Sequence, residues 1–554
     1  MKKPVLYLGG VLLLCTSALA RDATPDVSLG DPVYRTLDRF EARGWLADVP
    51  SIRPITRLEA ARLVLQVLRR ADAGTALSRT ELGDLQRHRV EFVGELQALG
   101  YRGPTGKGAS GGGGPGGMDF DVLSDSVRSL TFSPLVRQEL VLLRGDGQAR
   151  ETVSQTVVGG VIRGRYGERI GFRVHHFEAR EWSSRGRASR DEVMAGPIDE
   201  VRLGGKTADF RETGFQAIWA TRWFDLDIGK GTMAWGPGRT GGLFLGGKVP
   251  PFGMVRLRAS YGRVRFVHAV CLLKARPGLL DATGKLRSKH MTVHRLEVAL
   301  PKTLRLGLQE GVVYGDRGPE FIYLPPASVL LAAQTYLGDR DNTVIGLDVS
   351  ARPARNLKVY ACLFLDDLAK LSFSAFANKP AVQVGLFWVD PFGLRDSDLE
   401  VEYVRLEPYV YTHHFHINTF EHVDSLLGYP LGPNADRIHG RIVHAFSPSL
   451  RVAITVGRER EGENVPKPDG SLVNVGGDPR QGRRPDDAMA KRFMDGIVET
   501  RTRLGIDLAF EPLRDLRLGL GYETTRGRNV LRADGTRGSS RTNRLNVTAD
   551  VNLP

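Results

Sequence analysis

A glycine-rich stretch at residues 234–260 has the residue types, and nearly the spacing, of a phosphate-binding loop. Gly242, Gly247 and Lys248 match the pattern G-x-x-x-x-G-K, but Val249 stands where a magnesium-binding Ser or Thr follows in such loops. Two prolines come next and forbid the helix whose N–H groups would hold the phosphate. We therefore predict no nucleotide site. The glycines instead indicate backbone that passes close to backbone inside a crowded lumen or across a barrel wall.

A histidine-rich run at residues 411–416 offers donor atoms suited to a metal ion. If the run is a strand, His414 and His416 share one face and His413 points to the other, so at most two ligands converge. No carboxylate or cysteine flanks the run to complete a ligand set. The sequence favours surface histidines at the end of a strand, and we predict neither a metal nor a cofactor.

A glycine-rich linker at residues 103–117 contains two further patterns associated with active sites. Gly108 to Gly112 matches G-x-S-x-G, and Gly106, Gly108 and Gly111 match G-x-G-x-x-G. Neither pattern follows a predicted strand or opens a predicted helix, and glycine runs produce such matches by chance. No Ser–His–Asp arrangement is recognisable from spacing, so the sequence predicts a protein that is not an enzyme.

The elements that must position these residues begin with an export signal. Lys2 and Lys3 precede an apolar run and a small-residue cleavage site, so residues 1–20 are predicted to be a signal peptide. A lipoprotein modified at Cys15 is disfavoured because the bulky Leu14 precedes the cysteine. Cleavage removes two lysines and lowers the formal charge from +14 to +12. This charge favours acidic partners such as anionic glycans or lipid phosphates, and export argues against nucleic acid.

The mature chain lacks a disulfide framework and any apolar run long enough to cross a membrane as a helix. Cys271 and Cys362 stand outside C-x-x-C or zinc-like spacing, so two unpaired cysteines are expected. The apolar runs end at Arg, Asp or Gly, well short of the roughly 18 residues that a spanning helix needs. A membrane protein of this sequence can only be a β-barrel, with a soluble periplasmic protein as the rival.

Residues 31–100 have the pattern of a small helical bundle. Asp31 is a predicted N-cap before a first-turn proline, and Gly44 ends this first helix. Thr56 and Ser78 open capping boxes for a second and a third helix. Because the apolar faces of three short helices are small, we expect the bundle to dock on a larger domain.

The remaining chain changes its apolar period from 3.6 to 2. Residues 504–510 alternate between apolar and polar or small types, and residues 516–522 repeat the alternation after a short turn. Alternation alone fits a soluble sandwich or an outer-membrane barrel. The length of this region, the signal peptide, and short turns that alternate with long polar loops such as residues 458–492 favour the barrel. Strands of about ten residues give roughly 16 to 18 strands, so the predicted fold is mainly β.

Several motifs, taken in order along the chain, carry a family resemblance. They are Arg53-Pro54-Ile55-Thr56-Arg57-Leu58-Glu59, Trp235-Gly236-Pro237-Gly238, Pro250-Pro251-Phe252, and Asn342-Thr343-Val344-Ile345-Gly346-Leu347-Asp348 followed by Asp366-Asp367. From about residue 30 to the end, the chain resembles the capsule assembly Wzi family of outer-membrane proteins. The resemblance implies an 18-stranded antiparallel outer-membrane β-barrel plugged by a small periplasmic helical bundle. It also implies a surface lectin that holds capsular or exported polysaccharide at the cell.

The resemblance brings no catalytic residues, so candidate polysaccharide contacts come from side-chain chemistry. Aromatic faces suit sugar rings, and charged or amide groups suit carboxylates and hydroxyls. The candidates are Trp235, Arg239, Asp366, Asp367, Tyr411 and His414. Structural alternatives stay open: Trp235 packs against the barrel wall, and one of the two adjacent aspartates points inward to pair with a lumenal arginine.

Together these observations predict a non-enzymatic, monomeric protein of the outer membrane. It binds and organises acidic capsular or extracellular polysaccharide and contacts outer-membrane lipid. The alternative is a solute-selective outer-membrane porin, and a third hypothesis is a barrel lipase or deacylase whose triad comes from distant strands. The predicted domains are a signal peptide at 1–20, a helical bundle at 21–102, a glycine-rich linker at 103–120 and a transmembrane barrel at 121–554.

Overall fold

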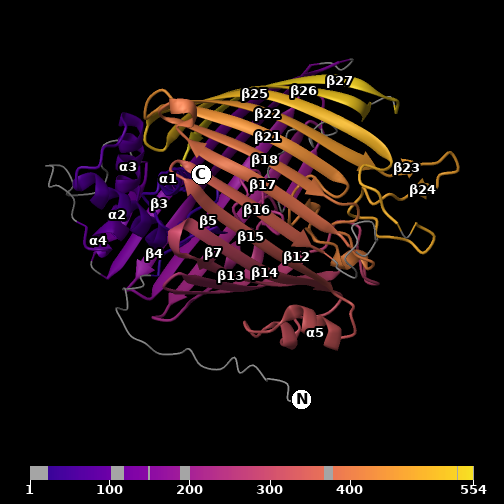
Figure 1. Ribbon diagram of the computed structural model, residues 1–554, viewed down its shortest axis with the longest axis horizontal. Helices are drawn as coiled ribbons and strands as arrows, with labels where there is room; N and C mark the ends of the chain where they lie inside the picture. Colours follow the sequence, from indigo (N-terminus) through magenta and orange to yellow (C-terminus); the bar gives the residue numbers. More distant parts are fainter. Residues whose placement is uncertain are drawn as a thin grey trace.

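The computed structural model is a closed antiparallel β-barrel with a helical bundle at one end (Figure 1). It describes residues 23–101, 118–125, 127–146, 150–186, 200–366, 378–488, 490–532 and 535–552. The predicted signal peptide and the glycine-rich patterns of residues 103–117 lie outside these described residues. No helix in the described part of the chain is long and apolar enough to span a membrane.

Eighteen strands of the described residues close the barrel, and β27 pairs with β3 to complete the circuit. They are β3 Arg128–Gly145, β4 Glu151–Tyr166, β5 Ile170–Ser183, β7 Thr207–Ala220, β8 Asp225–Gly231, β11 Phe252–Tyr261, β12 Val264–Lys274, β13 Ser288–Ala299, β14 Leu304–Gly315, β15 Asn342–Ala354, β16 Leu357–Leu365, β17 Pro380–Val389, β18 Ser397–Leu406, β21 Ala435–Ala445, β22 Leu450–Glu463, β25 Ile497–Leu513, β26 Leu516–Leu531 and β27 Arg537–Val551. Two shorter strands, β2 Phe120–Ser124 and β6 Glu200–Gly204, pair with β3 and β7. The predicted antiparallel barrel of about 18 strands is confirmed.

Along most of the wall, apolar side chains point outward and polar side chains point inward. On β13, Arg295 and Glu297 are fully buried, whereas Leu296 between them is 39% exposed. On the predicted hairpin, Ile506 pairs with Tyr522 and both side chains are exposed. A soluble sheet would bury the apolar face, so this reversed distribution places the apolar face against lipid and identifies an outer-membrane barrel.

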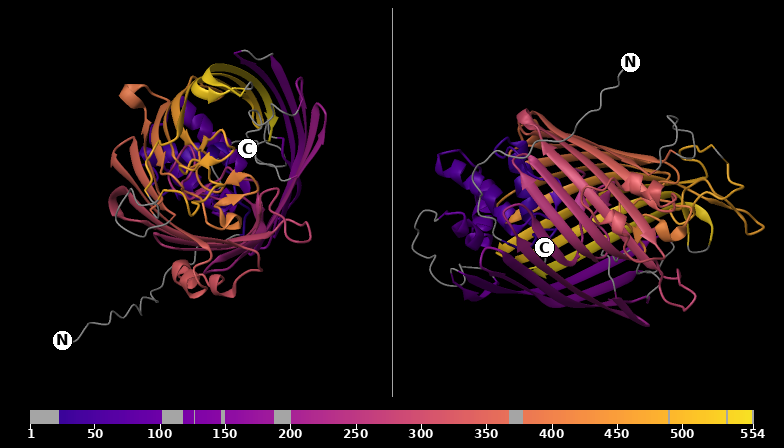
Figure 2. Two further views of the ribbon diagram at one scale, coloured as in Figure 1. Left: turned by 90° about the vertical axis from the view of Figure 1, so that its right-hand side faces the viewer. Right: turned by 90° about the horizontal axis from the view of Figure 1, so that it is seen from below.

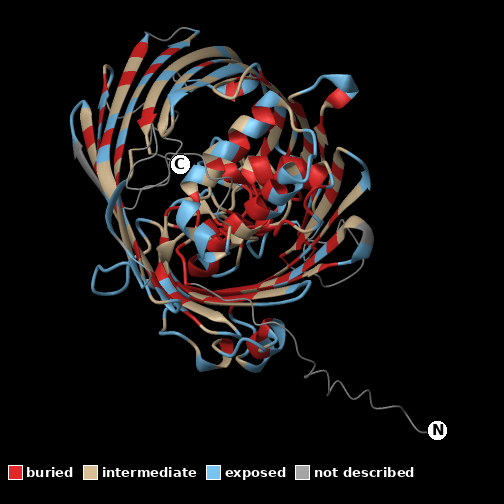
Figure 3. Ribbon diagram, turned by 90° about the vertical axis from the view of Figure 1, so that its left-hand side faces the viewer, coloured by how far each residue is buried: buried red, intermediate tan, exposed pale blue. Residues whose placement is uncertain are grey.

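Four helices form the N-terminal bundle: α1 Pro32–Ala42, α2 Arg57–Asp72, α3 Arg79–Glu91 and α4 Val93–Ala98. The predicted caps are confirmed as N-caps, because Asp31, Thr56 and Ser78 each accept a backbone N–H hydrogen bond at the start of a helix, and the reciprocal bond of a full capping box is formed at Ser78. The predicted third helix is two helices, since the backbone of Phe92 leaves helical geometry between α3 and α4. Figure 3 shows these helices inside the ring of strands.

The two ends of the barrel differ in the length of their connections. At the bundle end, residues 355–356 join β15 to β16 and residues 514–515 join β25 to β26. At the other end, residues 316–341, 407–434 and 464–496 form long connections. Figure 2 shows the bundle and these long loops at opposite ends. Since outer-membrane barrels have short turns on the periplasmic side, the bundle end is periplasmic and the long loops are external.

The connections of the barrel and of the bundle contain the remaining short elements of the described chain. Small strands are β1 Ile52–Arg53, β9 Ala234–Trp235, β10 Leu245–Gly246, β19 Glu421–His422, β20 Ser425–Leu426, β23 Val465–Pro466 and β24 Leu472–Val473. Helical turns are η2 Pro301–Thr303, η3 Phe321–Tyr323, η4 Pro391–Gly393 and η5 His416–Asn418, and a fifth helix is α5 Leu330–Tyr336.

Candidate functional site

The glycine-rich segment at residues 232–251 leaves the wall after β8, crosses the lumen and returns to the wall at β11. Inside, β9 pairs with both β1 and β10, so this segment joins the bundle to the barrel interior. A Cβ atom at Gly242 would lie 2.8 Å from the carbonyl oxygen of Trp235, which is too close for any other residue. The prediction of tightly packed backbone is confirmed.

Trp235 lies in the apolar core of the lumen. Its ring stacks on Phe244 with 6.0 Å between centroids, and the side chain is only 2% exposed. Around this pair pack Phe364 and Phe420, which come from the wall and from an external loop. A sugar ring needs an open aromatic face, which Trp235 does not offer in this structure. Trp235 thus lies where the structural alternative predicts, packed inside the barrel, and its direct contact with glycan stays a prediction.

Arg239 connects the bundle, the lumenal segment and the wall. Its guanidinium donates to Asp38 of α1 at 2.9 Å and to Glu400 of β18 at 2.7 Å, and its backbone N–H donates to Glu402 at 2.9 Å. It also lies over the ring of Phe387. Burial alone would lower the pKa of Arg239, but the two carboxylates raise it above its ordinary value. Arg239 therefore fastens the helical bundle and the lumenal segment to the barrel wall.

Asp366 and Tyr411 hold an external loop inside the barrel. A carboxylate oxygen of Asp366 accepts a hydrogen bond from the backbone N–H of Tyr411 at 2.5 Å, and both side chains are buried. The Tyr411 hydroxyl donates to the carbonyl of Leu243 at 2.7 Å and accepts from the backbone N–H of Tyr429 at 3.0 Å. Burial raises the pKa of Tyr411 above its usual range. Asp367 lies outside the described residues.

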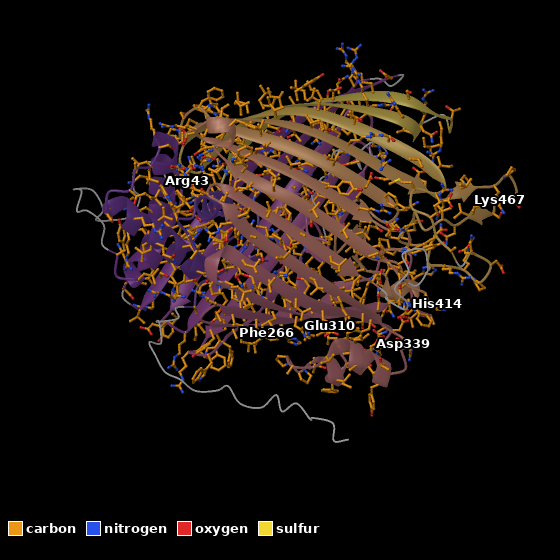
Figure 4. The ribbon with its side chains drawn as sticks, in the orientation of Figure 1. Arg43, Phe266, Glu310, Asp339, His414 and Lys467 are labelled. Atoms are coloured by element: carbon orange, nitrogen blue, oxygen red, sulfur yellow. The ribbon has the colours of Figure 1, made fainter. Side chains whose placement is uncertain are left out.

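Residues 407–434 and 464–496 together form what we call the external lid, the two loops that fold over the external mouth. Of the predicted site residues, His414 is the exposed one on this lid (Figure 4). Its ring meets Phe415 edge to face at 4.9 Å between centroids, and Phe415 is 47% exposed. The run lies after the end of β18 in a loop that leads into the turn η5 and is not itself a strand, while His414 and His416 are exposed as predicted for surface histidines. No cluster suited to a metal ion occurs in the described parts of the chain.

Two arginines lie beside His416: Arg480 from the second loop of the lid and Arg276 from a neighbouring loop. Arg480 is 45% exposed and donates to Asp424 at 3.1 Å, while Arg276 comes from the loop between β12 and β13. Burial and the charge of Arg276 lower the pKa of His416, which favours its neutral form. The lid and the adjoining β12–β13 loop thus combine exposed rings with arginine side chains, the groups that recognise sugar rings and carboxylates.

Sequence reasoning missed Arg276 and Phe415 as members of this surface. Arg276 stands in a loop with no neighbouring motif, and its proximity to the lid depends on contacts between segments distant in sequence, such as the hydrogen bond from the Lys274 backbone N–H to His422 at 3.0 Å. Phe415 stands between His414 and His416, and an aromatic residue within a run of histidines is the signal that could have identified it.

A cavity of about 180 Å³ remains near the periplasmic end, between the bundle and the wall. Its lining includes Asp26 of the segment before α1, Arg163 of β4, Arg173 of β5 and Arg514 of the turn between β25 and β26. Arg163 pairs with Asp119 at 2.7 Å, so part of the lining charge is already neutralised. Side chains therefore fill the lumen around Trp235, and a charged cavity remains between the bundle and the wall.

Comparison with known proteins supplies the family and the fold. A family model, Capsule assembly protein Wzi, matches residues 146–541, well over half of the chain. The structure is similar to that of Wzi from Escherichia coli, an outer membrane protein involved in group 1 capsule assembly and a carbohydrate-binding β-barrel. The TM-score is 0.56 and the identity 13%, over 95% of this chain and 99% of that chain.

Two further solved structures share part of this fold at lower TM-scores. OccK10 (OpdN) from Pseudomonas aeruginosa gives a TM-score of 0.41 with 13% identity, over 76% of this chain and 99% of that chain. OccK8 (OprE) from the same organism gives 0.43 with 10% identity, over 76% and 98%. Among curated proteins, none matches the chain.

Proposed function

We propose that this chain, a member of the capsule assembly protein Wzi family, binds acidic capsular or extracellular polysaccharide at its external lid and thereby holds it at the cell surface. The observation that carries the proposal is the group of exposed rings and arginines at the external mouth, formed by His414, Phe415 and Arg480 of the lid and by Arg276 of the adjoining β12–β13 loop. Rings of this kind pack against the apolar faces of sugars, and guanidinium groups pair with sugar carboxylates.

The buried candidates support this surface from below. Asp366 and Tyr411 fix the loop that carries His414, and Trp235 packs in the core on which the loop rests. We assign Asp366, Tyr411 and Trp235 a positioning role for the lid, whereas Arg239 fastens the lumenal segment to the bundle and the wall. This assignment requires no catalytic step and no cofactor. We further propose that the protein acts as a monomer surrounded by outer-membrane lipid.

The test compares lid variants for retention of the host's acidic polysaccharide on immobilised, folded protein. Phe415→Ala and Arg480→Gln are each expected to weaken binding about tenfold, because each removes roughly 1.4 kcal/mol of contact. Lys467→Gln is the matched control, since Lys467 is an exposed lid cation on the β23–β24 hairpin, apart from His414 (Figure 4). Binding that all three variants leave unchanged would contradict the proposal. An equal loss in Arg480→Gln and Lys467→Gln, with binding by Phe415→Ala unchanged, would indicate nonspecific charge attraction instead.

A second candidate function is solute passage, which the charged cavity beside the bundle favours. Planar-bilayer conductance distinguishes the two functions. A protein that only holds glycan should show little conductance, and a porin should conduct steadily whether or not glycan is present.

A further inference from the structure

The connection between β14 and β15 lies on the outer wall of the barrel, away from its mouth. Residues 316–341, which we call the flap, include η3 and α5, and Figures 1 and 2 show α5 outside the ring of strands. The backbone N–H groups of Leu330 and Leu331 donate to the carboxylate of Glu310 at 3.0 and 2.7 Å. Glu310 belongs to β14 and thus fastens the start of α5 to the wall.

Beneath the flap, the wall carries polar side chains on its lipid-facing side. His268 of β12, Thr292 of β13 and Glu310 of β14 alternate in register with the exposed leucines of the same strands, so they point outward. His294 joins this group, with its Nε2 atom 3.1 Å from a carboxylate oxygen of Glu310. His268 and Thr292 are nonetheless buried, at 4% and 0% exposure. Exposure of these polar groups to lipid would be unfavourable in free energy, and the flap covers them.

The flap itself has two faces. Tyr323, Leu330 and Ala333 are buried against Val312 and Tyr314 of β14. The opposite face leaves large apolar side chains exposed, and they are Phe321 at 85%, Tyr336 at 81%, Val329 at 62% and Leu331 at 47%. On the same strand below the flap, Leu306 and Leu308 are 42% and 49% exposed and belong to the lipid-facing wall. The exposed apolar face of the flap therefore continues the lipid-facing surface of the barrel.

We propose that the flap is seated in the outer leaflet of the membrane, with Phe321, Val329, Leu331 and Tyr336 in contact with lipid. Continuity with the apolar wall selects lipid as the occupant of this face. Aromatic residues at the edge of a barrel's apolar band occupy the interfacial layer, which suits Tyr336 and Phe321. The flap covers the polar section of the wall and presents an apolar surface to the lipid in its place. This role is independent of glycan binding, because the flap lies outside the barrel and the lid lies over its mouth.

The test places a nitroxide label at Tyr336→Cys in the full chain, reconstituted in liposomes, and measures collisions with oxygen and with a water-soluble nickel chelate. Oxygen concentrates in lipid and the chelate stays in water, so the ratio reports the environment. Leu308→Cys on the wall and Lys467→Cys on the lid provide the lipid and water references. Unsubstituted protein gives the background from Cys271 and Cys362, of which Cys271 is buried and Cys362 partly so.

We expect the label at Tyr336 to match that at Leu308, with oxygen collisions several-fold above those of the lid label. A match to Lys467 would overturn the proposal, because the flap would then lie in water. Protection from both reagents would also overturn it, since the face would then be covered by protein such as a second copy. Val329→Cys serves as a second reporter if the Tyr336 variant fails to fold, which heat-dependent migration on gels reveals.

Discussion

Replacement of Arg239 by methionine tests whether charge pairs hold the bundle in the barrel. The substitution keeps much of the side-chain volume but leaves Glu400 and Asp38 without the guanidinium that pairs with both. Both carboxylates are largely buried, and removal of one partner of a buried ion pair costs about 3–5 kcal/mol. Asp38 keeps a second partner, since Arg53 donates to it at 2.8 Å, so we expect the lower end of this range.

Hydrogen exchange at the backbone amides of α1 measures this cost directly. If exchange proceeds through undocking of the bundle, a loss of about 3 kcal/mol raises the exchange rate roughly 100-fold, because each 1.4 kcal/mol is tenfold. Addition of Glu400→Gln to the Arg239→Met variant should restore part of the protection, because it removes the unpaired charge. Arg128→Ala is the control, since Arg128 pairs with Asp125 in an exposed position and its loss should leave α1 unaffected.

Two results would refute this reasoning. One is exchange in the Arg239→Met variant that is no faster than in the Arg128→Ala control. The other is a double variant as unprotected as the single variant, since an uncompensated Glu400 would then not be the cause of the loss.

Three further predictions concern the lid and the bundle. Tyr411→Phe removes the hydroxyl that joins Leu243 to Tyr429, and the unsatisfied backbone groups should cost about 1–3 kcal/mol, seen as faster proteolysis within residues 407–434. Gly428→Ala should lower the midpoint of thermal unfolding because its Cβ would collide with Leu243 and Tyr411, whereas Gly440→Ala, with open space around it, should not. Burial and the charge of Glu91 raise the pKa of Asp31 to about 7, so its stabilising contribution is present below about pH 4 and is lost as the pH rises through 7. Asp31→Asn keeps the helix cap and should abolish this part of the pH dependence of α1 exchange; an unchanged profile would contradict the assignment.

The barrel and the helix starts could be predicted from sequence because both depend on near neighbours. The alternation of residues 504–510 follows from a wall with lipid on one side, whatever the partner strand. Asp31 and Ser78 cap their helices through backbone groups two or three residues away. In contrast, the split between α3 and α4 at Phe92 has only a weak local signal, since no proline stands there and Gly94 lies two residues further on, inside α4.

The site could be predicted only in part because its residues are placed by distant contacts. Trp235 in a glycine-rich loop looks the same in sequence whether its ring faces a ligand or the lumen core, and Phe244 and the wall decide this. Tyr411 is similarly fixed by Leu243. The sequence does contain a signal for the flap, because His268 and Glu310 interrupt the apolar face of their strands. Such an interruption predicts that another segment of the chain covers this part of the wall.

The bundle closes the periplasmic end of the barrel and the lid closes the external end, and the two depend on different physical interactions. A substitution at one end should therefore leave the other end unchanged. The bundle is fastened to the wall by buried ion pairs, such as that of Arg39 with Asp390 at 2.7 Å and that of Arg305 with Glu41 at 2.6 Å. The lid rests on an apolar core that includes Phe420 and Tyr429. Because the bundle contacts are ionic and the lid contacts are mainly apolar, loss of a bundle ion pair should loosen the periplasmic end while the external surface keeps its shape. The Arg239→Met variant should therefore still retain glycan even as its bundle exchanges faster.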